Sequence, residues 1–111
     1  AMCADPEIDL IDICTVTDQH AHLAIHALNA GKHVLVEKAI ALNQDQADQM
    51  VQTAQKNNQL LMVAHVLPFF PEFRYAYELA VSNKSGRLLG GHFKRVISKP
   101  DWSSDIGDAA K

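Results

Sequence analysis

The sequence predicts an α/β fold, a doubly wound parallel sheet in which short strands alternate with amphipathic helices. Within residues 1–66, three runs rich in Val, Ile and Leu are separated by two segments with helical periodicity. The chain is 48% hydrophobic and 21% charged, the balance of a protein with a packed core. We find no internal repeat and no low-complexity segment.

The first strand and helix are expected within residues 8–31. Residues 8–16 form a β-rich run whose apolar content is too continuous for a strand with one solvated face, so we expect a buried strand of a parallel sheet. From His20 the period becomes helical, and Gly31 lies where a left-handed C-terminal cap is needed. The apolar stripe of this helix contains Ala21, Ala24, Ile25 and Leu28.

A second strand and helix follow the same order. Residues 33–36 are predicted to form a short buried strand, and Asn43 opens a helix with Gln46 three residues later. The polar residues 56–58 end this helix before a third strand over residues 60–66. The stripe of the second helix contains Ala47, Met50, Val51 and Ala54.

After Pro68 we expect a helix that ends near Ser82 and Asn83, followed by a strand over residues 88–97. From Pro100 onward no periodicity remains. A terminal strand cannot bury its face alone, and three parallel strands leave an unpaired edge. We therefore expect this chain to be a piece of a larger fold. The stripe of the third helix contains Phe73, Ala76, Tyr77 and Ala80.

Charge and hydropathy exclude several classes of protein. The net charge of −3 comes without a basic stripe, so we do not expect nucleic acid as a partner. No apolar run approaches the roughly 20 residues of a membrane span, and no signal peptide is recognisable, so the cytoplasm is expected. There Cys3 and Cys14 would stay reduced, with Cys14 packed as a small hydrophobe.

Candidate chemistry lies in the loops after the three strands, because ligands of open α/β sheets bind at the carboxyl ends of the strands. Glu37 and Lys38 directly follow a buried strand, where a charged pair is costly unless a ligand needs it. An ammonium there can hydrogen-bond a substrate hydroxyl. The alternative is a surface ion pair that ends the strand.

Four histidines, His20, His22, His26 and His65, could have either a functional or a purely structural role. His22 and His26 are one helical turn apart and could share a metal ion with His20. All three are instead expected on the polar flank of the helix, and no carboxylate or cysteine completes a ligand set, so we predict no metal site. His65, at the end of the third strand, is either a hydrogen-bonded histidine at the edge of the core or a functional group.

Residues 9–15 (DLIDICT), His20 and residues 30–38 (AGKHVLVEK) carry a family resemblance. They resemble the glucose-fructose oxidoreductase, inositol dehydrogenase and MocA family (Gfo/Idh/MocA). The similarity continues through the strand ending at His65, through Pro71, and through residues 86–90 (GRLLG).

The resemblance implies a Rossmann domain coupled to an α+β C-terminal domain, and oxidation or reduction of sugars, polyols and related carbonyl compounds with NAD or NADP. Residues 1–70 would be the second half of the Rossmann sheet, residues 71–85 a connecting helix, and residues 86–111 the start of the C-terminal domain. The glycine-rich phosphate turn would precede Ala1, and no glycine of this chain forms it. The family also implies a homo-oligomer, and a piece that is inactive alone.

Site residues follow from the same resemblance. Lys38 matches the family lysine that reaches cofactor and substrate together, so it is the expected catalytic residue. The expected cofactor-binding residues are Thr15, Val16, Thr17, His20, Glu37, Lys38 and His65.

The chain departs from the family pattern at three places. Ala39 and Val16 stand where proline is usual, and residues 66–68 (VLP) replace polar and arginine positions. These departures leave a catalytically silent relative as an alternative. An unrelated receiver-like domain is the other rival, but it would need acidic residues clustered at strand ends.

Overall fold

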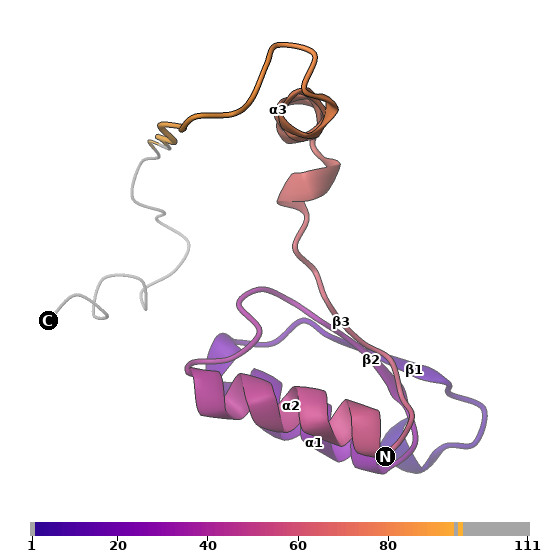
Figure 1. Ribbon diagram of the computed structural model, residues 1–111. Helices are drawn as coiled ribbons and strands as arrows, with labels where there is room; N and C mark the ends of the chain where they lie inside the picture. Colours follow the sequence, from indigo (N-terminus) through magenta and orange to yellow (C-terminus); the bar gives the residue numbers. More distant parts are fainter. Residues whose placement is uncertain (1, 95, 97–111) are drawn as a thin grey trace, which may run out of the picture. The chain divides into compact units, whose positions relative to one another are not determined.

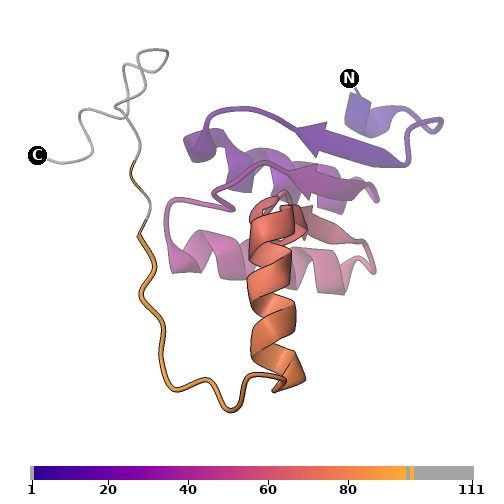
Figure 2. The ribbon, with the colours of Figure 1, turned by 90° about the horizontal axis from the view of Figure 1, so that it is seen from above.

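The computed structural model describes residues 2–94 and 96 (Figures 1 and 2). The chain divides into two compact units, residues 1–74 and residues 75–111. In order, the elements are a 3-10 turn η1 (Met2–Ala4), β1 (Leu10–Ile13), α1 (Thr17–Asn29), β2 (His33–Val36), α2 (Gln44–Lys56), β3 (Leu61–Val63), a 3-10 turn η2 (Leu67–Phe69) and α3 (Pro71–Ser82).

The sheet has three parallel strands in the order β1-β2-β3, which confirms the alternation predicted from the sequence. Ile13 pairs with Val36, and Val36 pairs with Val63. Because the strands are parallel, each connection must cross from one end of the sheet to the other, and α1 and α2 make these crossings. Both helices lie side by side on one face of the sheet (Figure 1).

The core lies between this face and the two helices. Leu28 and Met50 are the largest fully buried apolar side chains, and burying each stabilises the fold by about 1.5–3 kcal/mol. Small residues on α1 leave room for the helix to approach the sheet closely. The buried apolar residues are Ile11, Ile13, Ala21, Ala24, Ala27, Leu28, Val34, Val36, Met50 and Ala54.

The other face of the sheet corrects the expectation that the strands are buried on both sides. Leu10 is 52% exposed and Met62 is 57% exposed. Side chains alternate along a strand, and α1 and α2 both cover the same face, so these residues have no helix from α1 or α2 above them. The burial on two faces predicted for residues 8–16 is therefore wrong for the part of the chain that the structure describes.

Both crossover helices end in the same way. Gly31 has φ 78° and Asn58 has φ 53°, so each helix stops at a left-handed residue. The amide of Lys32 donates to the carbonyl of Ala27 at 3.1 Å, and the amide of Gln59 donates to the carbonyl of Ala54 at 2.9 Å. These are the bonds of a Schellman motif, which confirms the cap predicted at Gly31.

Element boundaries differ from the expected ones at three places. α1 begins at Thr17 rather than His20, because the polar residues 17–19 give no apolar period to detect. β1 and β3 are shorter than residues 8–16 and 60–66, because strands end where their pairing with the four-residue β2 ends. The start of α2 is confirmed, since the Asn43 side chain accepts from the Gln46 amide at 3.0 Å.

The C-terminal expectations are met in part. α3 forms as predicted, and none of its residues is buried. No strand is present in residues 88–94, the greater part of the segment where one was expected. A strand needs a neighbour for its backbone hydrogen bonds, and residues 88–94 make no backbone hydrogen bond with the part of the chain that the structure describes. Arg95, Ile97 and the segment from Pro100 lie outside the described residues.

Among the helices that the structure describes, we find none with the length and hydrophobicity of a membrane span.

We expect Gly31→Ala to lower the free energy of unfolding by about 1 kcal/mol. An added Cβ meets no atom within 4 Å, so the cost comes from the left-handed backbone alone. Urea unfolding of the chain followed by circular dichroism measures it. Gly31→Asn is the control and should cost less, because asparagine already occupies the equivalent position at residue 58. Equal losses in both variants would contradict this account.

Candidate functional site

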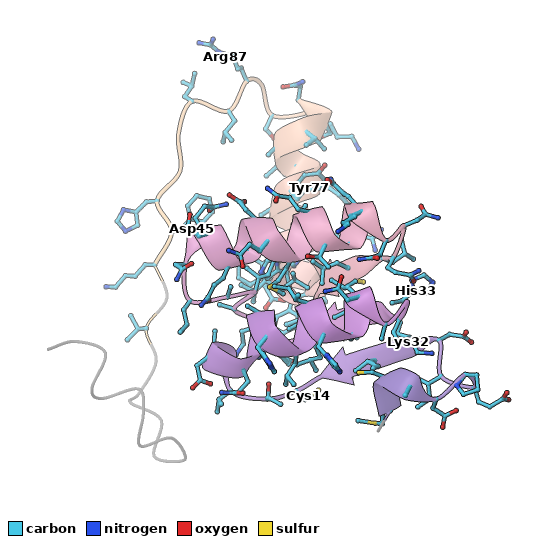
Figure 3. All side chains as sticks on the ribbon, turned by 90° about the horizontal axis from the view of Figure 1, so that it is seen from below. Cys14, Lys32, His33, Asp45, Tyr77 and Arg87 are labelled. Atoms are coloured by element: carbon cyan, nitrogen blue, oxygen red, sulfur yellow. The ribbon has the colours of Figure 1, made fainter. Side chains whose placement is uncertain are left out.

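Three loops meet at the carboxyl edge of the sheet because the strands are parallel and in register. The Glu37 amide donates to the carbonyl of Ile13 at 3.0 Å, and the Ala64 amide donates to the carbonyl of Val36 at 2.9 Å. The residues that follow each strand are therefore neighbours. Figure 3 shows Cys14 at this edge, with Lys32 and His33 at the opposite end of the sheet.

The loop between β1 and α1 carries three of the predicted cofactor residues. Thr15 is exposed, Val16 is 60% exposed, and Thr17 is half-buried as the first residue of α1. Val16 is the N-cap residue, and its side chain makes no capping hydrogen bond. The Gln19 amide donates to the Val16 carbonyl at 3.0 Å, and the N–H groups of Thr17 and Asp18 make no hydrogen bond with the described residues, so these two groups are available to an acceptor.

The loop after β2 contains Glu37 and Lys38. Glu37 is half-buried, and its Oε2 atom accepts a hydrogen bond from the backbone amide of Lys38 at 3.1 Å. Lys38 is exposed, and its ammonium makes no hydrogen bond or ion pair with the described residues. The peptide bond between Lys38 and Ala39 is cis. The ion-pair alternative is therefore wrong, and the Lys38 side chain is accessible to solvent.

His20 is not on the polar flank of α1, and that expectation is wrong. It is 0% exposed, with Nδ1 2.7 Å from the carbonyl oxygen of Ala39 and Nε2 3.0 Å from that of Thr15. The reason is helical spacing, since His20 shares the sheet-facing stripe with Ala24 and Ala27. His22 and His26 are exposed, as expected.

His65 lies at the same edge, two residues beyond the last residue of β3. It is exposed, and its side chain makes no hydrogen bond with the described residues, so the hydrogen-bonded core-edge interpretation is wrong. Its backbone amide donates to the carbonyl of Val63 at 2.7 Å. Among the residues that the structure describes, no group of three or more His, Cys, Asp and Glu side chains could hold a metal ion.

Cys14 was expected to pack as a small hydrophobe but is exposed. It follows Asp12 by two positions, so both side chains lie on the uncovered face of the sheet. A hydrogen bond with Asp12 raises the pKa of the Cys14 thiol, and desolvation and the charges of Asp12 and Glu37 raise this pKa further. The polar Asp12 inside an apolar run was the available signal that this face is not buried.

The comparison with known proteins agrees with this geometry. A sequence profile described as "Oxidoreductase family, NAD-binding Rossmann fold" matches residues 1–65. The chain belongs to the Gfo/Idh/MocA oxidoreductase family. Its three parallel strands and two crossover helices are a portion of the Rossmann domain of that family, which implies a nicotinamide dinucleotide as cofactor. The resemblance stated from residues 9–15, His20 and residues 30–38 is confirmed.

Individual relatives in the family are dehydrogenases of sugar derivatives and cyclic polyols. The chain is 33% identical to the levoglucosan dehydrogenase of Pseudarthrobacter phenanthrenivorans over 91% of this chain and 25% of that protein. The scyllo-inositol dehydrogenase of Lactobacillus casei superposes with a TM-score of 0.68 at 30% identity, over 77% of this chain and 25% of that chain. The myo-inositol 2-dehydrogenase of Lactobacillus plantarum has a TM-score of 0.67 at 28% identity, over 74% of this chain and 24% of that chain.

The chain spans only part of these proteins. It covers 32% of an oxidoreductase of Rhizobium meliloti and 22% of a dehydrogenase of Comamonas testosteroni.

The raised pKa of Cys14 gives a prediction about its reactivity. Only the thiolate reacts with iodoacetamide, so Cys14 should alkylate more slowly than an ordinary exposed cysteine near pH 8. Asp12→Asn removes the carboxylate charge and supplies an amide that can also donate to the thiolate, so the midpoint of the rate-against-pH curve should move to lower pH. Mass spectrometry of a Cys3→Ser chain measures the rate, with Asp45→Asn as the distant control. An unchanged midpoint in Asp12→Asn would refute the assigned cause.

Proposed function

We propose that the protein to which this chain belongs is an NAD(P)-dependent oxidoreductase of sugars, polyols or related hydroxyl and carbonyl compounds, active in the cytoplasm. The observation that carries the proposal is the exposed ammonium of Lys38, which is held at the carboxyl edge of the sheet without a partner among the described residues. The similarity of the chain to the levoglucosan and inositol dehydrogenases supports the substrate class.

The residues at this edge fit the nicotinamide end of a dinucleotide. Thr15 offers a hydroxyl, the first turn of α1 offers backbone N–H groups, and Lys38 offers an ammonium. These are hydrogen-bond donors of the kind that bind carboxamide, ribose and phosphate oxygens. We assign the contact with NAD or NADP to Thr15, Val16, Thr17, Glu37, Lys38 and His65.

In the proposed reaction, a bound nicotinamide would accept the hydride in oxidation, while the hydroxyl proton leaves to water, or would donate the hydride in reduction, while the oxygen takes a proton from water. Lys38 donates a hydrogen bond to the reacting oxygen of the substrate and orients its carbon for transfer. The positive charge of Lys38 also stabilises the negative charge that develops on this oxygen. The carboxylate of Glu37 holds the Lys38 amide, so the lysine backbone leaves β2 in a defined direction.

A larger architecture accompanies this proposal. The half-exposed Leu10 and Met62 leave one face of the sheet open for the other half of a doubly wound domain. An apolar hollow of about 170 Å³ beside the edge strand β1, lined in part by Cys3, Ile11 and Leu23, offers room for a further element. Residues 1–70 are then the second Rossmann half, residues 71–85 the connecting helix, and residues 86–111 the start of a C-terminal domain that forms homo-oligomers.

A catalytically silent relative is the second candidate. It is favoured by residues 66–68, which follow His65 at the carboxyl edge of the sheet and are apolar. Val66 is 48% exposed and Leu67 is 37% exposed. Charged donors that could hold a polar substrate are missing from these three positions. Such a protein would bind a ligand but would not turn over any polyol.

We expect Lys38→Met in the full-length protein to lower kcat for a polyol by about 10²- to 10³-fold, because it removes one donor to the reacting oxygen. The Kd for NADH or NADPH, measured by fluorescence, should change much less. Lys56→Met is the matched control, because Lys56 ends α2 and is also exposed. Dinucleotide binding without turnover in the wild type would favour the silent relative, and absence of dinucleotide binding would reject the dehydrogenase and leave the silent ligand-binding relative standing.

A further inference from the structure

Among the predicted site residues at the carboxyl edge, His20 alone is fully buried. We propose that His20 is a positioning residue, which ties the loop after β1 to the loop after β2 and thereby holds Lys38 in place. This inference rests on the proposed function and deepens it. It replaces the direct cofactor contact expected for His20 with an indirect role.

The hydrogen bonds of His20 join two segments that are far apart in the sequence. Nδ1 lies 2.7 Å from the carbonyl oxygen of Ala39, 19 residues away, and Nε2 lies 3.0 Å from that of Thr15, five residues away. Within the described residues, no other side-chain hydrogen bond links these loops. Both carbonyl oxygens only accept, so the imidazole bridges the two loops fully when each ring nitrogen carries a hydrogen, and it holds one loop when only one nitrogen does.

The bond to Ala39 acts on the residue next to Lys38. Fixing the carbonyl of Ala39 restricts the rotation of the chain at Lys38, so the direction in which the lysine side chain leaves the loop depends on His20. A displacement of about 1 Å in a reacting group can lower a rate by about 10²-fold. His20 is 0% exposed, so its ring presents no surface to a dinucleotide and can influence the reaction only through these carbonyls.

Because each ring nitrogen of His20 faces a different carbonyl, substitutions can test the contact with Ala39 and the contact with Thr15 separately. A neutral imidazole carries one N–H and donates to one carbonyl, whereas a protonated imidazole donates to both. An asparagine amide nitrogen occupies the place of Nδ1 and can still donate to Ala39. A glutamine amide nitrogen occupies the place of Nε2 and can donate to Thr15, and methionine fills the volume without a donor.

We would measure kcat, KM and dinucleotide Kd of the full-length protein with His20→Met, His20→Asn and His20→Gln, and with His22→Met as the exposed control on the same helix. His20→Met should lower kcat by about 10- to 100-fold, with a much smaller change in Kd. His20→Asn should recover more of the lost kcat than His20→Gln, because it keeps the bond next to Lys38. His22→Met should match the wild type.

Hydrogen exchange of the same variants tests the bridge without relying on activity. In His20→Met, amides of residues 37–42 should exchange faster, while residues 33–36 of the core strand should stay protected. Unchanged exchange at residues 37–42, or equal kcat in all three His20 variants, would overturn the inference. Faster exchange throughout residues 33–42 would also overturn it, because it shows a general loss of folding. If the wild type binds no dinucleotide, the proposed function fails, and exchange at residues 37–42 still decides whether the bridge exists.

Discussion

The parallel alignment of three short strands is the constraint on which the rest of the molecule depends. Parallel pairing forces each connection to cross the sheet, so α1 and α2 are required, and both begin beyond the carboxyl ends of their preceding strands. The same alignment brings Thr15, Glu37 and His65 to one edge although they are distant in the sequence. The candidate site is therefore a direct product of the strand order and register.

The sheet is covered by helices on one face only, so one face forms the core and the other face is exposed. The covered face packs Ile11, Val34 and Val36 against α1 and α2, whereas the other face leaves Leu10 and Met62 half-exposed. Cys14 is on the open side next to Asp12, which explains the raised pKa of its thiol. Each crossover helix ends at a left-handed residue, so the chain turns back into the next strand within a few residues.

Much of this organisation could be predicted from local signals. Gly31, the Asn43 and Gln46 pair, and the run over residues 33–36 each have a recognised physical role within a few residues of sequence. The burial of His20 could not be predicted from local signals, because the pattern of apolar residues in a helix does not show that a histidine belongs to its buried face. Its burial depends on the carbonyls of Thr15 and Ala39, and the sequence does not show which backbone atoms will be near. The strand expected over residues 88–97 likewise depends on partners that a local pattern cannot supply.

The central claim is that the carboxyl edge of this sheet holds the nicotinamide end of a dinucleotide with Lys38 beside it. A crystal structure of the full-length protein with NADH bound tests this claim most directly. The account predicts the nicotinamide ring against residues 15–17, with the Lys38 ammonium within hydrogen-bond distance of the cofactor or a bound substrate oxygen. A dinucleotide bound instead at the opposite edge, near Lys32 and Gln59, would contradict it.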